Sequence, residues 1–210
     1  MSQSDKYTPV AFAARQADIV GKPQRVAPLK FEELSAETRA MIDHIRAAVG
    51  AGPATAENMP GYFLTMAKHP EVFRCQLEMG TAIFKGAIPP HERELAVLRV
   101  AWLTRSPYEW GEHVDIAKRY GVSDEHVRRV AAGSSALGWS EHEAAILRAV
   151  EELLADQKIG DETWDELANT WNEQQLIEFP MMVGQYVATA FVQNSLRIRL
   201  AEDNPGLSHR

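Results

Sequence analysis

Cysteine is almost absent from this sequence: Cys75 is the single one among 210 residues. One cysteine cannot form an intrachain disulfide, and it cannot supply a thiol-rich metal site. Clustered positive charge is also lacking, because the formal net charge is −7 and the Lys and Arg residues are scattered. Nucleic acids and anionic membranes bind basic surfaces, so we expect neither as a partner.

Long apolar runs and the common nucleotide-binding motifs are missing as well. The N-terminal stretch has no long apolar run after a basic start, which is unlike a secretory signal. The most apolar segment near the C-terminal end, residues 181–192, contains Gln185 and is too short to span a bilayer. The sequence has no Gly-rich phosphate loop and no G-x-S-x-G motif. We therefore expect a cytoplasmic protein that is not a typical serine hydrolase.

The apolar pattern predicts helices over nearly the whole chain after residue 30. Apolar positions recur at helical spacing, and no segment alternates as a half-buried strand does. Hydrophobic residues make up 45% of the chain, which is enough for one sizeable core. We predict an all-α fold of about eight or nine helices, with a single domain over residues 31–210. Residues 1–30 lack sustained periodicity and are predicted to form an extended N-terminal arm, and Pro180 is predicted to kink or break the last helix.

Three polar side chains fall on apolar helix faces. In the helix predicted over residues 107–120, His113 lies near the middle of the apolar face and Glu109 lies one turn before it. The i,i+4 spacing lets the carboxylate reach the imidazole. In the preceding helix, Glu94 projects onto an apolar side, where a carboxylate needs a donor, a proton or a functional pocket. The tight Ser106-Pro107 turn between the helices could bring the three together.

Each of these residues also has a purely structural explanation. Ser106 and Glu109 have the spacing of a capping box, with Pro107 at the first helical position. His113 could be a hydrogen-bonded core histidine, and Glu94 could pair with an arginine such as Arg93 or with one from a neighbouring subunit. A metal site made by Glu94, Glu109 and His113 is a further alternative, but no second histidine lies near in sequence, and we expect none.

The run ERELAVLRVAWLTRSPYEWGEHVDIAKRYGVSDEHV resembles the carboxymuconolactone decarboxylase and AhpD-like alkylhydroperoxidase superfamily. The later run QLIEFPMMVGQYVATAFVQNSLRI is similar to the C-terminal helix of its longer bacterial members. The resemblance covers most of residues 32–200 and implies an AhpD-like helical bundle. It also implies a homo-oligomer, a trimer or a hexamer, and the arm together with the apolar last helix favours such an assembly.

In the peroxidase branch of this superfamily, a glutamate is followed by a Cys-x-x-Cys and then by a histidine. That register places Glu94 on the glutamate, Ser106 and Glu109 on the two cysteines, and His113 on the histidine. A serine hydroxyl cannot form a sulfenic acid or a disulfide, so thiol peroxidase chemistry is not expected at this site. The acid–base residues remain, as the decarboxylase side of the superfamily would need.

The resemblance implies a cofactor-independent lyase that acts on a small carboxylated lactone or aromatic-derived acid. We expect His113 to be the general acid/base, Glu109 to orient its imidazole, and Glu94 to be a second proton carrier or a polar positioning group. The residues expected to contact the substrate are Ser106, Tyr108, Trp110 and Trp102. Another proton-transfer enzyme (an isomerase, a hydratase or a hydrolase) and a non-catalytic helical oligomer remain as alternatives.

Overall fold

The computed structural model describes residues 7–48 and 50–209, and within them the protein is built from helices without any strand. This confirms the all-α prediction, although the ten α-helices of the described residues exceed the expected number. Two short 3-10 helices, Phe31–Glu33 and Gly206–Ser208, accompany them. The α-helices are α1 Pro9–Val20, α2 Ala36–Ala48, α3 Gly61–Met66, α4 Pro70–Phe84, α5 Pro90–Leu103, α6 Pro107–Arg119, α7 Asp124–Ala132, α8 Glu141–Asp156, α9 Asp161–Ala168 and α10 Glu173–Leu196.

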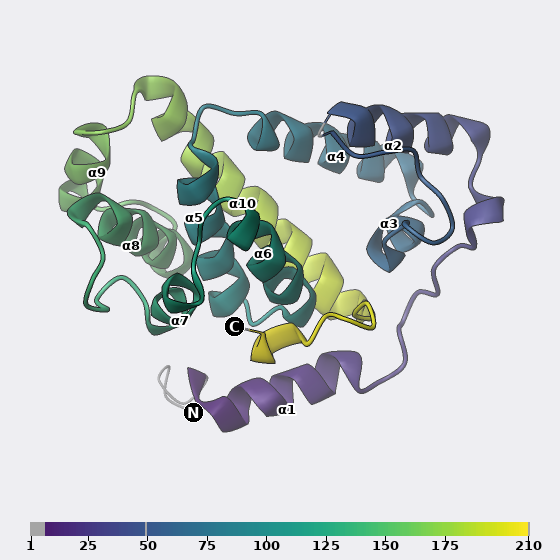
Figure 1. Cartoon of the computed structure of the whole chain (residues 1–210), viewed down its shortest axis with the longest axis horizontal. Coiled ribbons are helices and arrows are strands. Elements are labelled where there is room, and N and C mark those ends of the chain that lie inside the picture. Colours follow the sequence, from purple (N-terminus) through teal and green to yellow (C-terminus); the bar gives the residue numbers. More distant parts are fainter. Residues whose placement is uncertain (1–6, 49, 210) are drawn as a thin grey trace.

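Helix α5 is the centre of the molecule. It packs against α6, α7, α8 and α10, and Figure 1 shows α5, α6 and α10 side by side in the middle of the fold. Every residue from Arg93 to Trp102 is buried, so α5 has no solvent-facing side along that length. Such a helix normally consists of apolar residues, and the charged side chains within it therefore need partners inside the protein.

The N-terminal segment differs from the predicted extended arm, because residues 9–20 form helix α1. Thr8 caps this helix, and Pro9 occupies its first turn, where the missing amide hydrogen costs nothing. Phe12 stacks on Trp102 of α5 with 3.9 Å between ring centroids, which holds α1 against the body. Only the segment after α1 is extended, and it runs along the outside of the molecule towards α2 (Figure 1). The local Thr-Pro cap signal was present in the sequence.

Helix α10 continues through Pro180 without the predicted break and ends at Leu196. Proline removes one backbone hydrogen bond there, but the buried side chains of Leu176, Phe179 and Met182 pack on both sides of it. No helix in the described part of the chain is long and apolar enough to cross a membrane.

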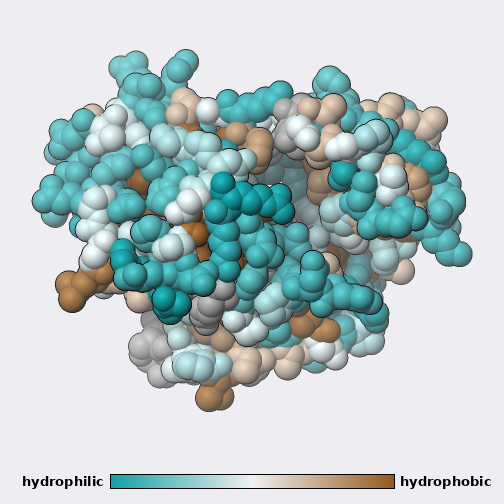
Figure 2. All heavy atoms as spheres, in the orientation of Figure 1, coloured by the Kyte–Doolittle hydropathy of each residue, from teal (hydrophilic) through white to brown (hydrophobic). Residues whose placement is uncertain are grey.

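Three hydrophobic clusters surround the centre of the fold. The first joins α5, α8 and α10, the second joins α1, α5, α6 and α7, and the third joins α2, α3 and α4. Figure 2 shows that the surface is hollowed between the α2–α4 region and the body that contains α6 and α10. The polar residues predicted from the sequence lie on α5 and α6, next to this junction.

Candidate active site

The turn between α5 and α6 determines how the candidate residues meet. Ser106 is the N-cap of α6, and its hydroxyl accepts a hydrogen bond from the Glu109 amide at 3.4 Å. The Glu109 carboxylate does not complete the expected capping box, because the Ser106 amide instead donates to the carbonyl of Ala101. The side chain of Glu109 is therefore turned towards His113, one turn further along α6.

Glu94, His113 and Glu109 converge as the sequence indicated. The Nδ1 of His113 lies 2.7 Å from Oε2 of Glu94, and Nε2 lies 3.3 Å from Oε1 of Glu109. Both ring nitrogens therefore face a carboxylate. Glu94 and Glu109 are fully enclosed, whereas the imidazole keeps 12% of its surface exposed. We call these three residues the carboxylate–histidine triad.

Arg93 completes the charge balance of the triad. Its Nε donates to Oε1 of Glu94 at 3.0 Å, and its Nη1 donates to the carbonyl of Phe84. The guanidinium also lies over the rings of Phe84 and Tyr120, which suits a weakly hydrated cation. The partner of Glu94 is thus its own sequence neighbour in the same chain.

Charge interactions outweigh burial at both Glu94 and His113. Burial opposes ionisation of Glu94, but His113 and Arg93 together hold the pKa of its carboxyl below the ordinary value. Burial likewise favours a neutral imidazole, but the charge of Glu94 and the hydrogen bond that His113 donates to Glu109 raise the pKa of His113 to about 10. At neutral pH the triad therefore holds an imidazolium between two carboxyl groups.

Two of the four predicted substrate contacts lie beside the triad. Ser106 is fully buried and donates to Oε1 of Gln193 at 3.0 Å. Tyr108 precedes Glu109 on α6, and burial and then the charges of Glu112 and Glu109 raise its pKa. The phenol is therefore protonated at any physiological pH.

The other two predicted contacts, Trp102 and Trp110, belong to the second hydrophobic cluster. Their rings lie 4.7 Å apart, and Trp102 also stacks on Phe12 of α1. The indole of Trp110 donates to the backbone carbonyl of His209. Through these contacts the two tryptophans hold α1 and the segment around His209 against α5 and α6. Trp102 also lines a cavity of about 660 Å³ next to Phe12, and the expected substrate contacts of both tryptophans stay predictions.

Sequence reasoning missed the contribution of α10. Tyr186 lies edge to face with the His113 ring, with 5.1 Å between centroids, and Gln193 is buried against Ser106. Both are polar residues of α10, and they are seven positions apart, which places them on one face. That spacing was the available signal. Arg99 of α5 is also buried.

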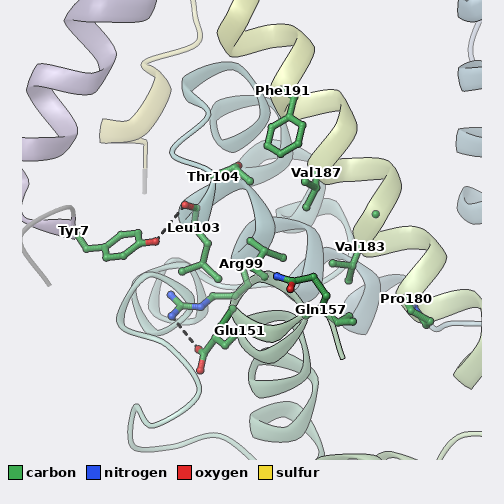
Figure 3. Close-up of a pocket in the computed structure, with 14 residues that line it drawn as sticks. Tyr7, Arg99, Leu103, Thr104, Glu151, Gln157, Pro180, Val183, Val187 and Phe191 are labelled. Atoms are coloured by element: carbon green, nitrogen blue, oxygen red, sulfur yellow. Dashed lines mark hydrogen bonds and ion pairs between the residues drawn. The ribbon is translucent and has the colours of Figure 1, made fainter. Parts of the chain in front are cut away.

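The most prominent cavity lies elsewhere, between α5, α8 and α10. It has a volume of about 880 Å³ and apolar walls that include Leu103, Val187 and Phe191. Figure 3 shows the Arg99–Glu151 ion pair in this cavity and Tyr7 donating to the carbonyl of Leu103. No triad residue lines it. Across the described residues, no group of three or more His, Cys, Asp or Glu side chains is arranged to hold a metal ion.

Comparison with known proteins shows a family similarity around this geometry. Residues 70–152, which include the whole triad, match the model of the carboxymuconolactone decarboxylase family. Solved structures of AhpD-like proteins share the fold of the chain. No curated protein matches its sequence significantly.

Solved structures with the same fold match most of this chain. An uncharacterised peroxidase-related protein from Ralstonia eutropha JMP134, described as an AhpD core, is 17% identical with a TM-score of 0.72, covering 87% of this chain and 95% of that one. A cysteine-to-alanine variant of the debrominase Bmp8 in complex with 2,3,4-tribromopyrrole is 16% identical with a TM-score of 0.67, covering 87% and 94%. A protein of unknown function from Agrobacterium tumefaciens is 14% identical with a TM-score of 0.59, covering 65% and 94%.

Proposed function

We propose that the chain is a cofactor-independent lyase of the carboxymuconolactone decarboxylase type, acting by general acid/base catalysis on a small carboxylated substrate. One observation carries the proposal: a partly accessible imidazole lies between two enclosed carboxyl groups, 2.7 Å and 3.3 Å from its nitrogens. Perturbed titratable groups of this kind cluster at functional sites. The match of residues 70–152 to the decarboxylase family supports the same reaction class.

The distances favour exchanging two of the roles expected from the sequence. Glu94 makes the short contact to His113 and is itself held by Arg93, so it is the residue that orients the imidazole. Glu109 makes the longer contact, and its charge raises the pKa of Tyr62, Tyr108 and Tyr186, so Glu109 lies near these three tyrosines. The Nε2 proton of His113 is therefore the one available to a substrate.

The reaction follows from the protonation state of His113. Cleavage of the bond to the substrate carboxylate releases carbon dioxide and leaves the electron pair on the adjacent carbon, conjugated with a carbonyl as an enolate. The imidazolium of His113 then donates its proton to that carbon, and solvent returns a proton to the imidazole. Neither an oxidant nor a reductant is consumed in this sequence.

Redox chemistry of a dithiol has no support at this position. Ser106 and Glu109 stand where the peroxidase branch has its two cysteines, and Cys75 lies exposed on α4. The complex of the Bmp8 variant with tribromopyrrole supports a small ring as ligand, because it shows that this fold accommodates one.

A panel of small carboxylated lactones and unsaturated keto acids, assayed for carbon dioxide release in deuterated water, tests the proposal. We expect release from at least one member, with one deuterium incorporated at the carbon that lost the carboxylate. The variant His113→Gln should lose turnover by about a hundredfold to ten-thousandfold. Product analysis by NMR separates a lyase from an isomerase, a hydratase or a hydrolase.

The matched control is His142→Gln. His142 has a side chain of similar burial, 16% exposed, and it also contacts a carboxylate, Glu92, at 3.4 Å. This variant should turn substrate over as the wild type does. Full turnover by His113→Gln, or no carbon dioxide from any member of the panel, would overturn the proposed reaction.

We also propose that the chain forms a homo-oligomer through α10. Ile177, Met181 and Phe191 are large apolar side chains that are 52% to 70% exposed on this helix, at spacings that place them along one stripe. Light scattering on the wild type and on the double variant Ile177→Asp/Phe191→Asp tests this; an unchanged mass would contradict it. The trimer or hexamer and the cytoplasmic location expected from the sequence stay predictions.

A further inference from the structure

Tyr186 approaches the triad from the helix opposite to α5 and α6. Its ring lies at 89° to the His113 ring with 5.1 Å between centroids. The triad itself comes entirely from α5 and α6, so Tyr186 is the group that α10 contributes to the same space. A substrate in contact with the exposed edge of His113 would therefore meet Tyr186 as well.

The hydroxyl group of Tyr186 makes no hydrogen bond to any described residue. It is also not among the enclosed polar atoms that lack a partner, so solvent or a ligand can reach it. Two other tyrosines differ in this respect: the buried Tyr62 is bonded to Gln76, and the half-buried Tyr7 donates to the carbonyl of Leu103. The hydroxyl of the half-buried Tyr108 likewise makes no hydrogen bond to a described residue. The unused donor of Tyr186 is therefore informative because of its place beside the His113 ring.

The surroundings of Tyr186 also keep its phenol protonated. Burial raises the pKa of Tyr186, and the charges of Glu94 and Glu109 raise it further, while Arg93 acts in the opposite direction. A protonated phenol donates one hydrogen bond through its hydroxyl. The same carboxylates would repel a negatively charged substrate oxygen unless donors such as this hydroxyl and the imidazolium received it.

We propose that Tyr186 is a further catalytic residue, whose hydroxyl donates a hydrogen bond to the substrate oxygen that gains negative charge. This inference rests on the proposed function, since that oxygen is the enolate oxygen formed when carbon dioxide leaves. The hydroxyl keeps its proton throughout, and the proton that ends on carbon comes from His113. Donors that are already in place where charge develops contribute strongly to catalysis in a site with little water.

The arrangement defines the substrate class more narrowly. The bond to the carboxylate must break next to a carbonyl, or to an extended conjugated system that ends in one, because only then does the charge reach an oxygen. Tyr186 and His113 lie on different helices, so the accepting oxygen and the carbon that takes the proton must be separate atoms of one small molecule. An unsaturated lactone acid or a β-keto acid meets both requirements.

4-Nitrophenol is a probe for this oxyanion position, because its ionised form has a negative oxygen on a planar conjugated frame and a distinct visible absorbance. We expect the wild type to bind it as the phenolate. Tyr186→Phe removes only the hydroxyl and should weaken phenolate binding by roughly tenfold to a hundredfold, the range for a hydrogen bond to a charged group. Tyr7→Phe removes the same group far from the triad in sequence and contacts, and should bind as the wild type does.

A neutral probe separates loss of the hydrogen bond from loss of shape. 4-Nitrotoluene has a methyl group in place of the oxygen, so its affinity should be the same for the wild type and Tyr186→Phe. Equal phenolate affinity in the two proteins, or no phenolate binding by the wild type, would overturn the proposal. A parallel loss of both probes would assign Tyr186 a packing role and also overturn it.

Failure of this inference is distinguishable from failure of the proposed function. If Tyr186 controls phenolate binding while no acid loses carbon dioxide, the oxyanion position stands and the lyase assignment fails. If an acid is decarboxylated with dependence on His113, and Tyr186→Phe changes neither its rate nor probe binding, the lyase stands and the role of Tyr186 fails.

Discussion

Helix α5 carries two buried arginines, and their surroundings differ. Arg99 pairs with Glu151 of α8 at 2.9 Å, and its Nη1 donates to the carbonyls of Val130 and Ala131 in the last turn of α7. Glu151 also accepts from the backbone and the hydroxyl of Ser134. This pair thus connects three helix segments and satisfies carbonyl groups that a helix end leaves without partners.

Arg93 instead meets a titratable group through Glu94. The carboxylate of Glu94 lies between Arg93 and His113, and the imidazole in turn contacts Glu109. The charge of the imidazole in this set can therefore change with pH or by proton transfer to a ligand, whereas the Arg99 pair contains no histidine. A buried ion pair by itself indicates a structural role. A buried ion pair that contacts an accessible histidine indicates a functional site.

Replacing Glu94 gives the largest expected effect on folding and tests this comparison directly. Glu94→Gln leaves Arg93 without a buried counter-charge, and it should lower the free energy of unfolding by about 3–5 kcal/mol. Urea denaturation measures this loss. The pKa of His113, followed by NMR, should fall further in Glu94→Gln than in Glu109→Gln, because Glu94 makes the shorter contact; the reverse order would contradict the assigned roles.

The pH dependence of stability should show the titration of His113, which contacts the Arg93–Glu94 pair. The folded pKa of His113 is about 10, above its ordinary value of 6.5, so the folded state binds the extra proton between these values. This contribution is fully present below pH 6.5 and is lost as pH rises through about 10. Glu94 has a lowered pKa, so its contribution is present above pH 4.5 and is lost as pH falls through the folded value. Urea titrations between pH 6 and pH 10 should show a steeper loss of stability for the wild type than for His113→Gln; parallel curves would contradict the ion pair.

The Arg99 pair should contribute less, and only to stability. Arg99→Met removes hydrogen bonds to the end of α7, but Glu151 is 28% exposed and regains water. We expect a loss of about 1–3 kcal/mol in the free energy of unfolding. The His113 pKa and the turnover should match those of the wild type; a shift in either would show that the two arginines are coupled.

Cys75 should give the smallest effect of all. It is exposed on α4, and the family register places no cysteine beside His113. Cys75→Ser should change the free energy of unfolding by less than about 0.5 kcal/mol and leave turnover intact. Loss of activity on substitution or on alkylation would require thiol chemistry and would contradict the acid/base proposal.

The triad was predictable because its members are local. Glu109 and His113 are one helical turn apart, and Glu94 precedes them by one helix and a tight turn. A charged residue on an apolar helix face is visible in a sequence, since period and polarity disagree at that position. The fold class was predictable for the same reason, because helical spacing recurs along almost the whole chain.

Contacts between distant helices were not predictable from spacing. Trp102 and Trp110 lie on broad apolar faces of the two site helices, and helical spacing alone does not say which element each face meets. Phe12, a residue about ninety positions earlier, packs on Trp102 and holds α1 there. The burial of Arg99 depends in the same way on the helices that surround α5 on all sides.

The sequence by itself determined most of the helices, the cap at Ser106, the absence of a redox-active cysteine pair, and the local meeting of an imidazole with a carboxylate. These follow from interactions within a few residues of one another, for which spacing is sufficient. Only the tertiary structure decided that Arg93 faces Glu94 inside the protein and that the ring of Tyr186 contacts the ring of His113. It also decided that Trp102 packs against α1 and that Trp110 binds the C-terminal segment. Those outcomes depend on which helix covers which face, and that choice minimises buried unpaired charge and exposed apolar surface over the whole chain.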